Sequence, residues 1–175
     1  HCGRPAEASQ LIVEAISRAE RVGHDVAKSA ALMSRTGVYV DRGHLERAEL
    51  AAREALEFAE SFHFGWIFIA EASLGGILLY RGQTEEALAL LHKATRHSTH
   101  FSGVPEGLLA WGMTAAEMEG AANARAAGMR FLPRPGISRG FGAWHAVLSM
   151  TEALCLSGCR EQAARLRIEA EKIAA

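Results

Sequence analysis

The chain has 175 residues with a formal net charge of −1, and 49% of its residues are apolar. This length suits one domain with a sizeable core, and the balanced charge gives no sign of a nucleic-acid or membrane-surface partner. The three cysteines, Cys2, Cys155 and Cys159, have neither metal-site nor redox spacing, which favours a reducing, cytoplasmic location.

The first predicted helix covers residues 5–22 and follows a turn at Gly3. Pro5 suits the first helical turn, where its missing N–H does no harm, and Gly23 ends the helix. One face repeats at helical spacing and carries Ala8, Ile12, Ala15 and Ala19. We interpret residues 1–23 as the second half of a helical pair. Because the sequence starts at His1 and inside a pair, we expect it to be a piece of a longer protein.

Residues 27–61 form the next predicted unit, with two helices joined at Gly43. Leu32, Thr36 and Tyr39 mark one face of its first helix. The second helix carries a stripe of small residues at Ala48, Ala52, Ala55 and Ala59. Small side chains on that stripe let two helix backbones approach closely.

Residues 66–100 repeat this arrangement around Gly82. Gly75 and Leu78 lie in the first helix, and the stripe of the second is Ala87, Leu91 and Ala94. The apolar run from Phe62 to Tyr80 is long enough to raise the question of a membrane span. Glu71 at its centre would cost about 2.5–3.5 kcal/mol in a bilayer, so we expect a buried amphipathic helix instead.

Two further units complete the chain. Residues 104–132 form a degenerate unit with a predicted turn at Gly120, and residues 139–175 recover the pattern around Gly158. In the last unit the first helix carries Val147, Thr151 and Leu154, and the second carries Ala163, Leu166, Ala170 and Ile173.

The spacing of the turns indicates a repeat. Gly3 and Gly43 are 40 residues apart, Gly43 and Gly82 are 39 apart, and Gly82 and Gly158 are 76 apart, which is twice 38. A fixed period of this size is typical of a solenoid. The sequence therefore predicts an all-α, right-handed solenoid of about nine helices in antiparallel pairs, organised as one repeat domain.

These residues resemble the tetratricopeptide (TPR) repeat. Its pattern of a small residue, an apolar residue three positions later, a turn glycine and then an alanine is matched three times. The three sets are Gly75, Leu78, Gly82 and Ala87; Thr36, Tyr39, Gly43 and Ala48; and Thr151, Leu154, Gly158 and Ala163. The period of 38–40 residues exceeds the usual value of about 34, and the signature Trp and Pro are missing.

The Gly-Arg-Pro-x-Glu-Ala turn and the phrase from Arg53 to Trp66 are similar to repeat arrays of large bacterial signalling proteins. Those arrays join an ATPase module to a nucleotide cyclase domain or to a LuxR-type DNA-binding domain. The resemblance implies a regulatory interaction scaffold for a protein, a peptide or neighbouring domains of the same chain. A small-molecule-sensing domain of a LuxR-type regulator is the alternative.

Other clusters favour structural interpretations. His92, His97 and His100 have no further ligand to complete a metal set, so we expect surface histidines. We expect Cys155 to pack as a small apolar residue and not to act with Cys159 as a redox pair. Arg134 and Arg139 suit a solvated loop better than an anion site. No catalytic residue, metal or cofactor is expected.

The concave face of a helical solenoid is its usual binding surface, and the first helix of each pair lines it. Residues expected on this face are Met33, Gly37, Asp41, Ile69, Gly76, Tyr80, His145, Leu148 and Glu152. The polar members of this set, Asp41, Tyr80, His145 and Glu152, are the more informative because core packing does not require them.

Overall fold

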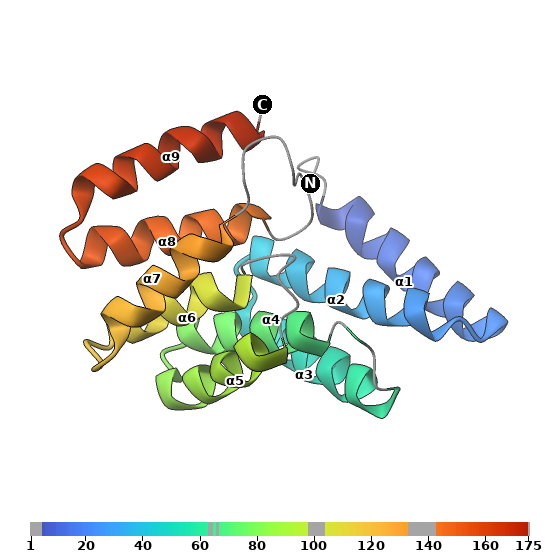
Figure 1. Ribbon diagram of the computed structural model, residues 1–175. Helices are drawn as coiled ribbons and strands as arrows, with labels where there is room; N and C mark the ends of the chain where they lie inside the picture. Colours follow the sequence, from blue (N-terminus) through green and yellow to red (C-terminus); the bar gives the residue numbers. More distant parts are fainter. Residues whose placement is uncertain (1–4, 63–64, 66, 98–103, 133–142, 175) are drawn as a thin grey trace. The chain divides into compact units, whose positions relative to one another are not determined.

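The computed structural model describes residues 5–62, 65, 67–97, 104–132 and 143–174, and this part of the chain holds nine α-helices and no strand (Figure 1). The chain divides into two compact units, His1–Gln83 and Thr84–Ala175. No helix in the described ranges is both long and apolar enough to cross a membrane.

The first unit contains α1 (Pro5–Val22), α2 (Asp25–Asp41), α3 (Leu45–Ser61) and α4 (Ile67–Tyr80). Each helix contacts the next along the chain, and α4 also contacts α2. The α2–α3 turn needs a left-handed residue, which Gly43 supplies with a φ of 71°. The N–H of Gly43 bonds to the carbonyl of Val40 and that of His44 to the carbonyl of Tyr39, so the last carbonyls of α2 are satisfied.

The core of the first unit follows the predicted small-residue stripe. Ala48, Ala52, Ala55 and Ala59 of α3 are all buried, which confirms the close approach of its neighbours. The prediction for α4 was right about burial and wrong about amphipathicity. Leu74 and Leu78 are buried on one side of α4, and Ala72 and Gly76 are buried on the opposite side. Both α2 and α3 contact α4. A single apolar stripe in the sequence indicates only one packing face of a helix, so it could not predict that α4 packs against two helices.

The second unit contains α5 (Thr84–His97), α6 (Val104–Ala115), α7 (Ala121–Phe131), α8 (Ala143–Leu156) and α9 (Arg160–Ala174). Helix α6 contacts α5, α7 and α8, while α8 also contacts α7 and α9. Gly107 of α6 lies so close to α8 that an added Cβ would be 3.0 Å from the carbonyl oxygen of Ala146. The first helices of consecutive pairs, α6 and α8, therefore pack backbone against backbone.

Gly120 lies in the turn of the degenerate unit, as predicted, and has a φ of 85°, but it is not the residue that ends α6. Helix α6 ends earlier, where the N–H of Glu117 bonds to the carbonyl of Thr114 and that of Met118 to the carbonyl of Met113. Glu117 itself holds the left-handed conformation, with a φ of 53°, and Gly120 is the N-cap of α7. The degenerate unit has a longer turn, so counting residues from the other turn glycines misplaces the helix end.

The prediction that Cys155 packs as an apolar residue is also wrong. A buried cluster joins α8 to α9 through Val147, Met150, Leu154 and Leu166 among others, and Cys159 packs against it. Cys155 is exposed because it lies on the other side of the last turn of α8. The side chains of Ala170 and Ile173 lie outside the described residues.

The all-α fold of helical pairs is confirmed, and the observed helices fall within or close to the predicted units. Helix α1 has the predicted bounds, and the predicted turns at Gly43, Gly82 and Gly158 have positive φ. Gly3 lies outside the described residues. The organisation as one domain of five repeat units stays a prediction.

Candidate binding surfaces

In the first unit, the first helices of the pairs carry matching stripes of side chains. We define positions in α2 and α4 as equivalent when they precede the turn glycines, Gly43 and Gly82, by the same number of residues. The α2 stripe is Ala30, Ser34, Gly37 and Asp41. The α4 stripe is Ile69, Ser73, Gly76 and Tyr80. Each set has the spacing of one helical face, and the two helices are in contact.

Serine and glycine recur at the centre of both stripes, while the ends differ. Asp41 and Tyr80 occupy the same position, the last residue of α2 and of α4, and both are exposed. The Tyr80 side chain is 55% exposed despite its aromatic ring. At Gly37 an added Cβ would meet nothing within 4 Å, so the backbone of α2 is open to approach there.

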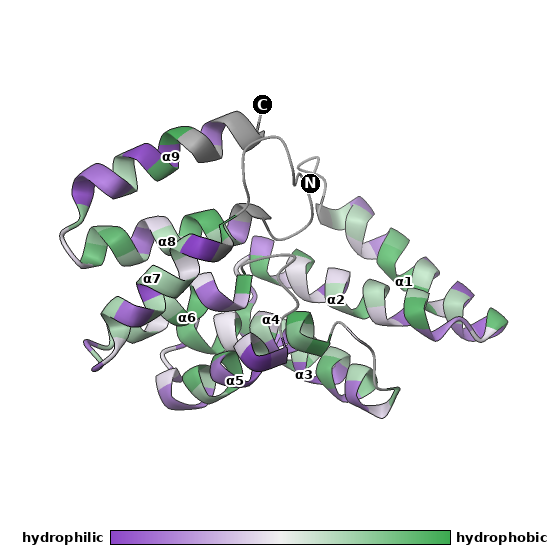
Figure 2. Ribbon diagram, viewed as in Figure 1, coloured by the Kyte–Doolittle hydropathy of each residue, from purple (hydrophilic) through white to green (hydrophobic). Residues whose placement is uncertain are grey.

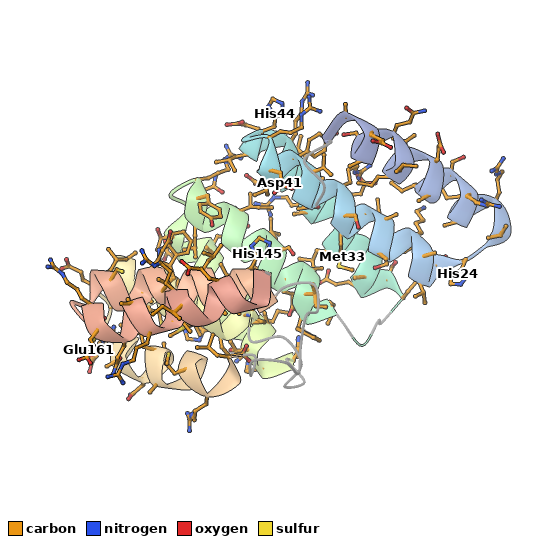
Figure 3. The ribbon with its side chains drawn as sticks, turned by 90° about the horizontal axis from the view of Figure 1, so that it is seen from above. His24, Met33, Asp41, His44, His145 and Glu161 are labelled. Atoms are coloured by element: carbon orange, nitrogen blue, oxygen red, sulfur yellow. The ribbon has the colours of Figure 1, made fainter. Side chains whose placement is uncertain are left out.

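Met33 and Asp41 both project from α2 (Figure 3), where Met33 is half-buried and Asp41 exposed. Ile69 is half-buried on α4, and Gly76 is buried. The predicted residues of the first unit thus lie on two contacting helices. That they form one continuous binding surface stays a prediction.

In the second unit, three predicted residues lie together on α8. His145, Leu148 and Glu152 are spaced by three and four positions, and all three are exposed (Figure 3 labels His145). Leu156, one turn beyond Glu152, extends the exposed face, and its side chain is 58% exposed. We call these four residues the α8 stripe. Three of its residues, His145, Glu152 and Leu156, are at the same distances from Gly158 as Ile69, Gly76 and Tyr80 are from Gly82. The fourth equivalent position is Ser149, which is buried, and the exposed Leu148 beside it takes its place in the stripe.

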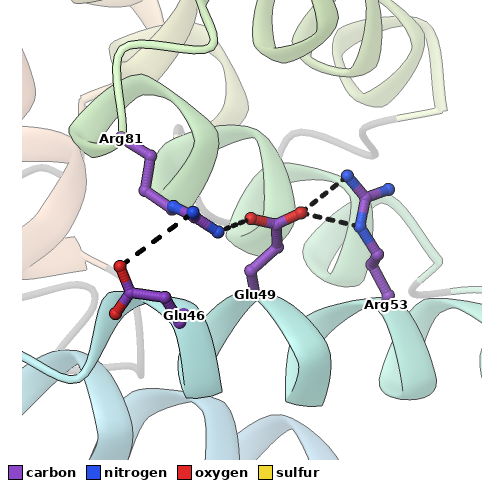
Figure 4. A network of polar contacts seen from close by, with 4 residues as sticks. All are labelled: Glu46, Glu49, Arg53 and Arg81. Atoms are coloured by element: carbon purple, nitrogen blue, oxygen red, sulfur yellow. Dashed lines mark hydrogen bonds and ion pairs between the residues drawn. The ribbon is translucent and has the colours of Figure 1, made fainter.

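A charged network that periodicity did not predict fixes the end of the α4 stripe. Arg81, which follows Tyr80, forms an ion pair with Glu49 of α3 and lies 4.0 Å from a carboxylate oxygen of Glu46 (Figure 4). Arg53 approaches Glu49 from the other side, with Nε 2.9 Å and Nη2 2.8 Å from Oε1. The Glu49 side chain is only 12% exposed.

This network ties the C-terminal end of α4 to α3 and so restricts where Tyr80 can lie. Charge-assisted hydrogen bonds to one largely buried carboxylate are stronger than exposed ion pairs. The spacing of Glu49 and Arg53 within one helix could have indicated their pairing. Arg81 is 32 residues from Glu49, and nothing in the repeat pattern connects the two.

No group of three His, Cys, Asp or Glu side chains in the described ranges could hold a metal ion. His92 and His97 are exposed on α5. His100, Arg134 and Arg139 lie outside the described residues, so the predictions for them stay predictions.

No protein-family model and no curated protein matches the sequence. Among solved structures, the chain is similar to the nearly identical TPR-like repeats of a candidate kinesin light chain from Podosopora anserina. The identity is 14% and the TM-score 0.61, over 99% of this chain and 88% of that one. A single-residue variant of the same repeats gives 13% identity and a TM-score of 0.55, over 99% and 97% of the two chains. The fold is that of TPR-like repeats.

Proposed function

We propose that the chain is an interaction scaffold that binds a protein or peptide segment across the first helices of its pairs. The observation that supports this most is the repeated stripe. Ser34 and Ser73, and likewise Gly37 and Gly76, recur at equivalent positions, whereas the exposed helix ends carry Asp41 in one case and Tyr80 in the other. Small residues recur at the centre of each stripe, whereas the exposed residue at its end differs. This pattern suits an extended partner that contacts equivalent positions of successive repeats.

The chemistry of the ends indicates how a partner would be held. Tyr80 offers an aromatic face and a hydroxyl, the combination that is enriched at protein interfaces. Asp41 offers a carboxylate that accepts hydrogen bonds from backbone or basic groups. The open backbone at Gly37 and the half-buried Met33 leave room for a partner side chain to approach α2.

The finer context is also a proposal. The sequence resemblance favours a regulatory segment of a larger bacterial signalling protein, either cyclase-linked or LuxR-type. In both cases the scaffold would act on a separate effector domain and would have no catalytic activity of its own. A nucleotide-binding loop encoded upstream of His1 would support this context.

The experiment is a selection of peptides from a displayed library on the intact chain, followed by affinity measurements on variants. We expect the selected peptides to bind the Asp41→Ala/Tyr80→Ala double variant at least about 30-fold more weakly, since interface anchors contribute over 1 kcal/mol each. The control is Leu50→Ala, because Leu50 of α3 is 70% exposed and lies outside both stripes. Its affinity should be unchanged.

Two results would contradict the proposal. One is equal affinity of the double variant and the control for every selected peptide. The other is a fall in the melting temperature of Tyr80→Ala with no selective loss of binding, which would make Tyr80 a structural residue at the turn. If a small molecule raises the melting temperature while no peptide is selected, the LuxR-type sensor is the better hypothesis.

A further inference from the structure

Helix α1 exposes a face that is covered in the equivalent helices of this chain. Counted from the predicted turn at Gly3, Leu11 of α1 is equivalent to Ala51 of α3, Leu90 of α5 and Leu166 of α9. Ala51 is 4% exposed, Leu166 is 8% exposed and Leu90 is half-buried, whereas Leu11 is 57% exposed. An exposed leucine at a position that is otherwise covered indicates a missing neighbour.

The same difference extends over two turns of the helix. Ala15 is exposed, while the equivalent Ala55 is 2% exposed. Ala8 is half-buried, while Ala48 has no exposure. Ala19, nearer the turn into α2, is buried like its equivalent in α3. Apolar residues also recur along the α1 ribbon in Figure 2.

The contacts of the other second helices show what covers this face. Helix α3 contacts α2 before it and α4 after it, whereas α1 contacts only α2 among the helices of the described part of the first unit. In the second unit, Leu166 of α9 belongs to a buried cluster with Val147, Met150 and Leu154 of α8. The residue equivalent to Leu11 is thus buried by the first helix of its own pair.

We propose that the face of α1 centred on Leu11 and Ala15 is a docking site for one further amphipathic helix of the same type as α8. Its apolar residues would have the spacing of Val147, Met150 and Leu154, and it would lie antiparallel to α1. This helix would complete a pair in which α1 is the second member. The inference rests on the repeat register and is independent of the proposed function.

The chain itself provides the probe. Residues 143–159, which contain α8 and its turn, are placed directly before Pro5 so that the added turn has the register of the α8–α9 turn. The α8 sequence is the suitable choice because its own partner, α9, also presents a leucine at this position. The protein is kept reduced because the added segment contains Cys155 and Cys159.

We expect the added helix to raise the thermal midpoint of the first unit by about 4–8 °C, because a leucine and neighbouring alanines become buried. Amide hydrogen exchange along α1 should slow in parallel. Exchange reports on α1 directly, even where the second unit determines the overall melting curve.

Two substitutions on the same helix make the test specific. Leu11→Glu should abolish both gains in the extended chain and leave the midpoint of the original chain nearly unchanged. Val13→Glu is the matched control, because Val13 is 64% exposed but projects about 200° away from Leu11 around the helix. It should leave both gains intact.

Three results would overturn the proposal. The first is an extended chain with no slower exchange in α1. The second is a gain that persists with Leu11→Glu. The third is self-association of the original chain in sedimentation experiments that Leu11→Glu abolishes, since a second copy would then cover this face.

Discussion

Two glycines inside helices have opposite surroundings and give a quantitative test of the structure. Gly37 of α2 has open space where a side chain would project, with nothing within 4 Å of an added Cβ. Gly107 of α6 has the backbone of α8 in that place, with the carbonyl oxygen of Ala146 at 3.0 Å and its Cα at 3.3 Å. Substitution of each by alanine separates helix propensity from packing.

The two substitutions share one favourable contribution. Alanine is better than glycine in a helix interior by about 1 kcal/mol, largely through the entropy of the unfolded chain. We therefore expect Gly37→Ala to stabilise the chain by about 0.5–1 kcal/mol. At Gly107 the new methyl group meets backbone atoms, which cannot rotate away, and overpacking costs about 1–3 kcal/mol. The net effect of Gly107→Ala is a loss of about 1 kcal/mol.

The first assay is chemical denaturation of both variants. The second is the affinity of Gly37→Ala for the peptides selected on the original chain. On the proposed binding surface formed by the α2 stripe and the α4 stripe, the added methyl group fills space that a partner would enter. The affinity for the peptides should therefore fall although the stability of the chain rises. A stabilising Gly107→Ala would show that α6 and α8 do not approach as the structure has them. Unchanged affinity for Gly37→Ala would remove the centre of the α2 stripe from the binding surface.

Four further outcomes are expected. Ala87→Leu should lower stability by about 1–3 kcal/mol, because Ala87 is fully buried, and an unchanged denaturant midpoint would refute its register. In a double-mutant cycle, Glu49→Ala and Arg81→Ala should show a coupling of about 1–2 kcal/mol, and a value near zero would reduce the network to exposed ion pairs. Glu117→Gly should raise the midpoint, since left-handed backbone costs a side chain about 1 kcal/mol or more. Zinc should leave the melting temperature unchanged, and a shift lost on His97→Ala would indicate a metal site.

Much of the fold could be predicted because the repeat places small residues at fixed distances from each turn. Ala48, Ala87 and Ala163 follow their turn glycines by five residues, and all three are buried. A small side chain at that position is required wherever two helix backbones approach closely. The same steric requirement recurs in each unit, so the repeat reveals it within a single sequence.

The errors arose where a helix has more than one neighbour or where a turn changes length. The burial of α4 on several sides depends on α2 as well as α3, and an apolar period reports only one face. The early end of α6 depends on Glu117 adopting a left-handed conformation, which no residue type signals. The pairing of Arg81 with Glu49 depends on how two helices are placed beside each other, which periodicity does not specify.

For the candidate binding surfaces, the sequence identified a face of each helix, and counting back from the predicted turns Gly43 and Gly82 aligns Ser34 with Ser73 and Gly37 with Gly76. The burial of these aligned residues required the structure, in which Gly37 is half-buried and Gly76 is buried. Where a repeat fixes the packing residues, a departure from the repeat at an exposed position is not required by the core. The change from Asp41 to Tyr80 is such a departure, and Leu11 on α1 is another. Both positions should therefore be governed by what binds there, which is why each is the centre of an experiment that separates binding from stability.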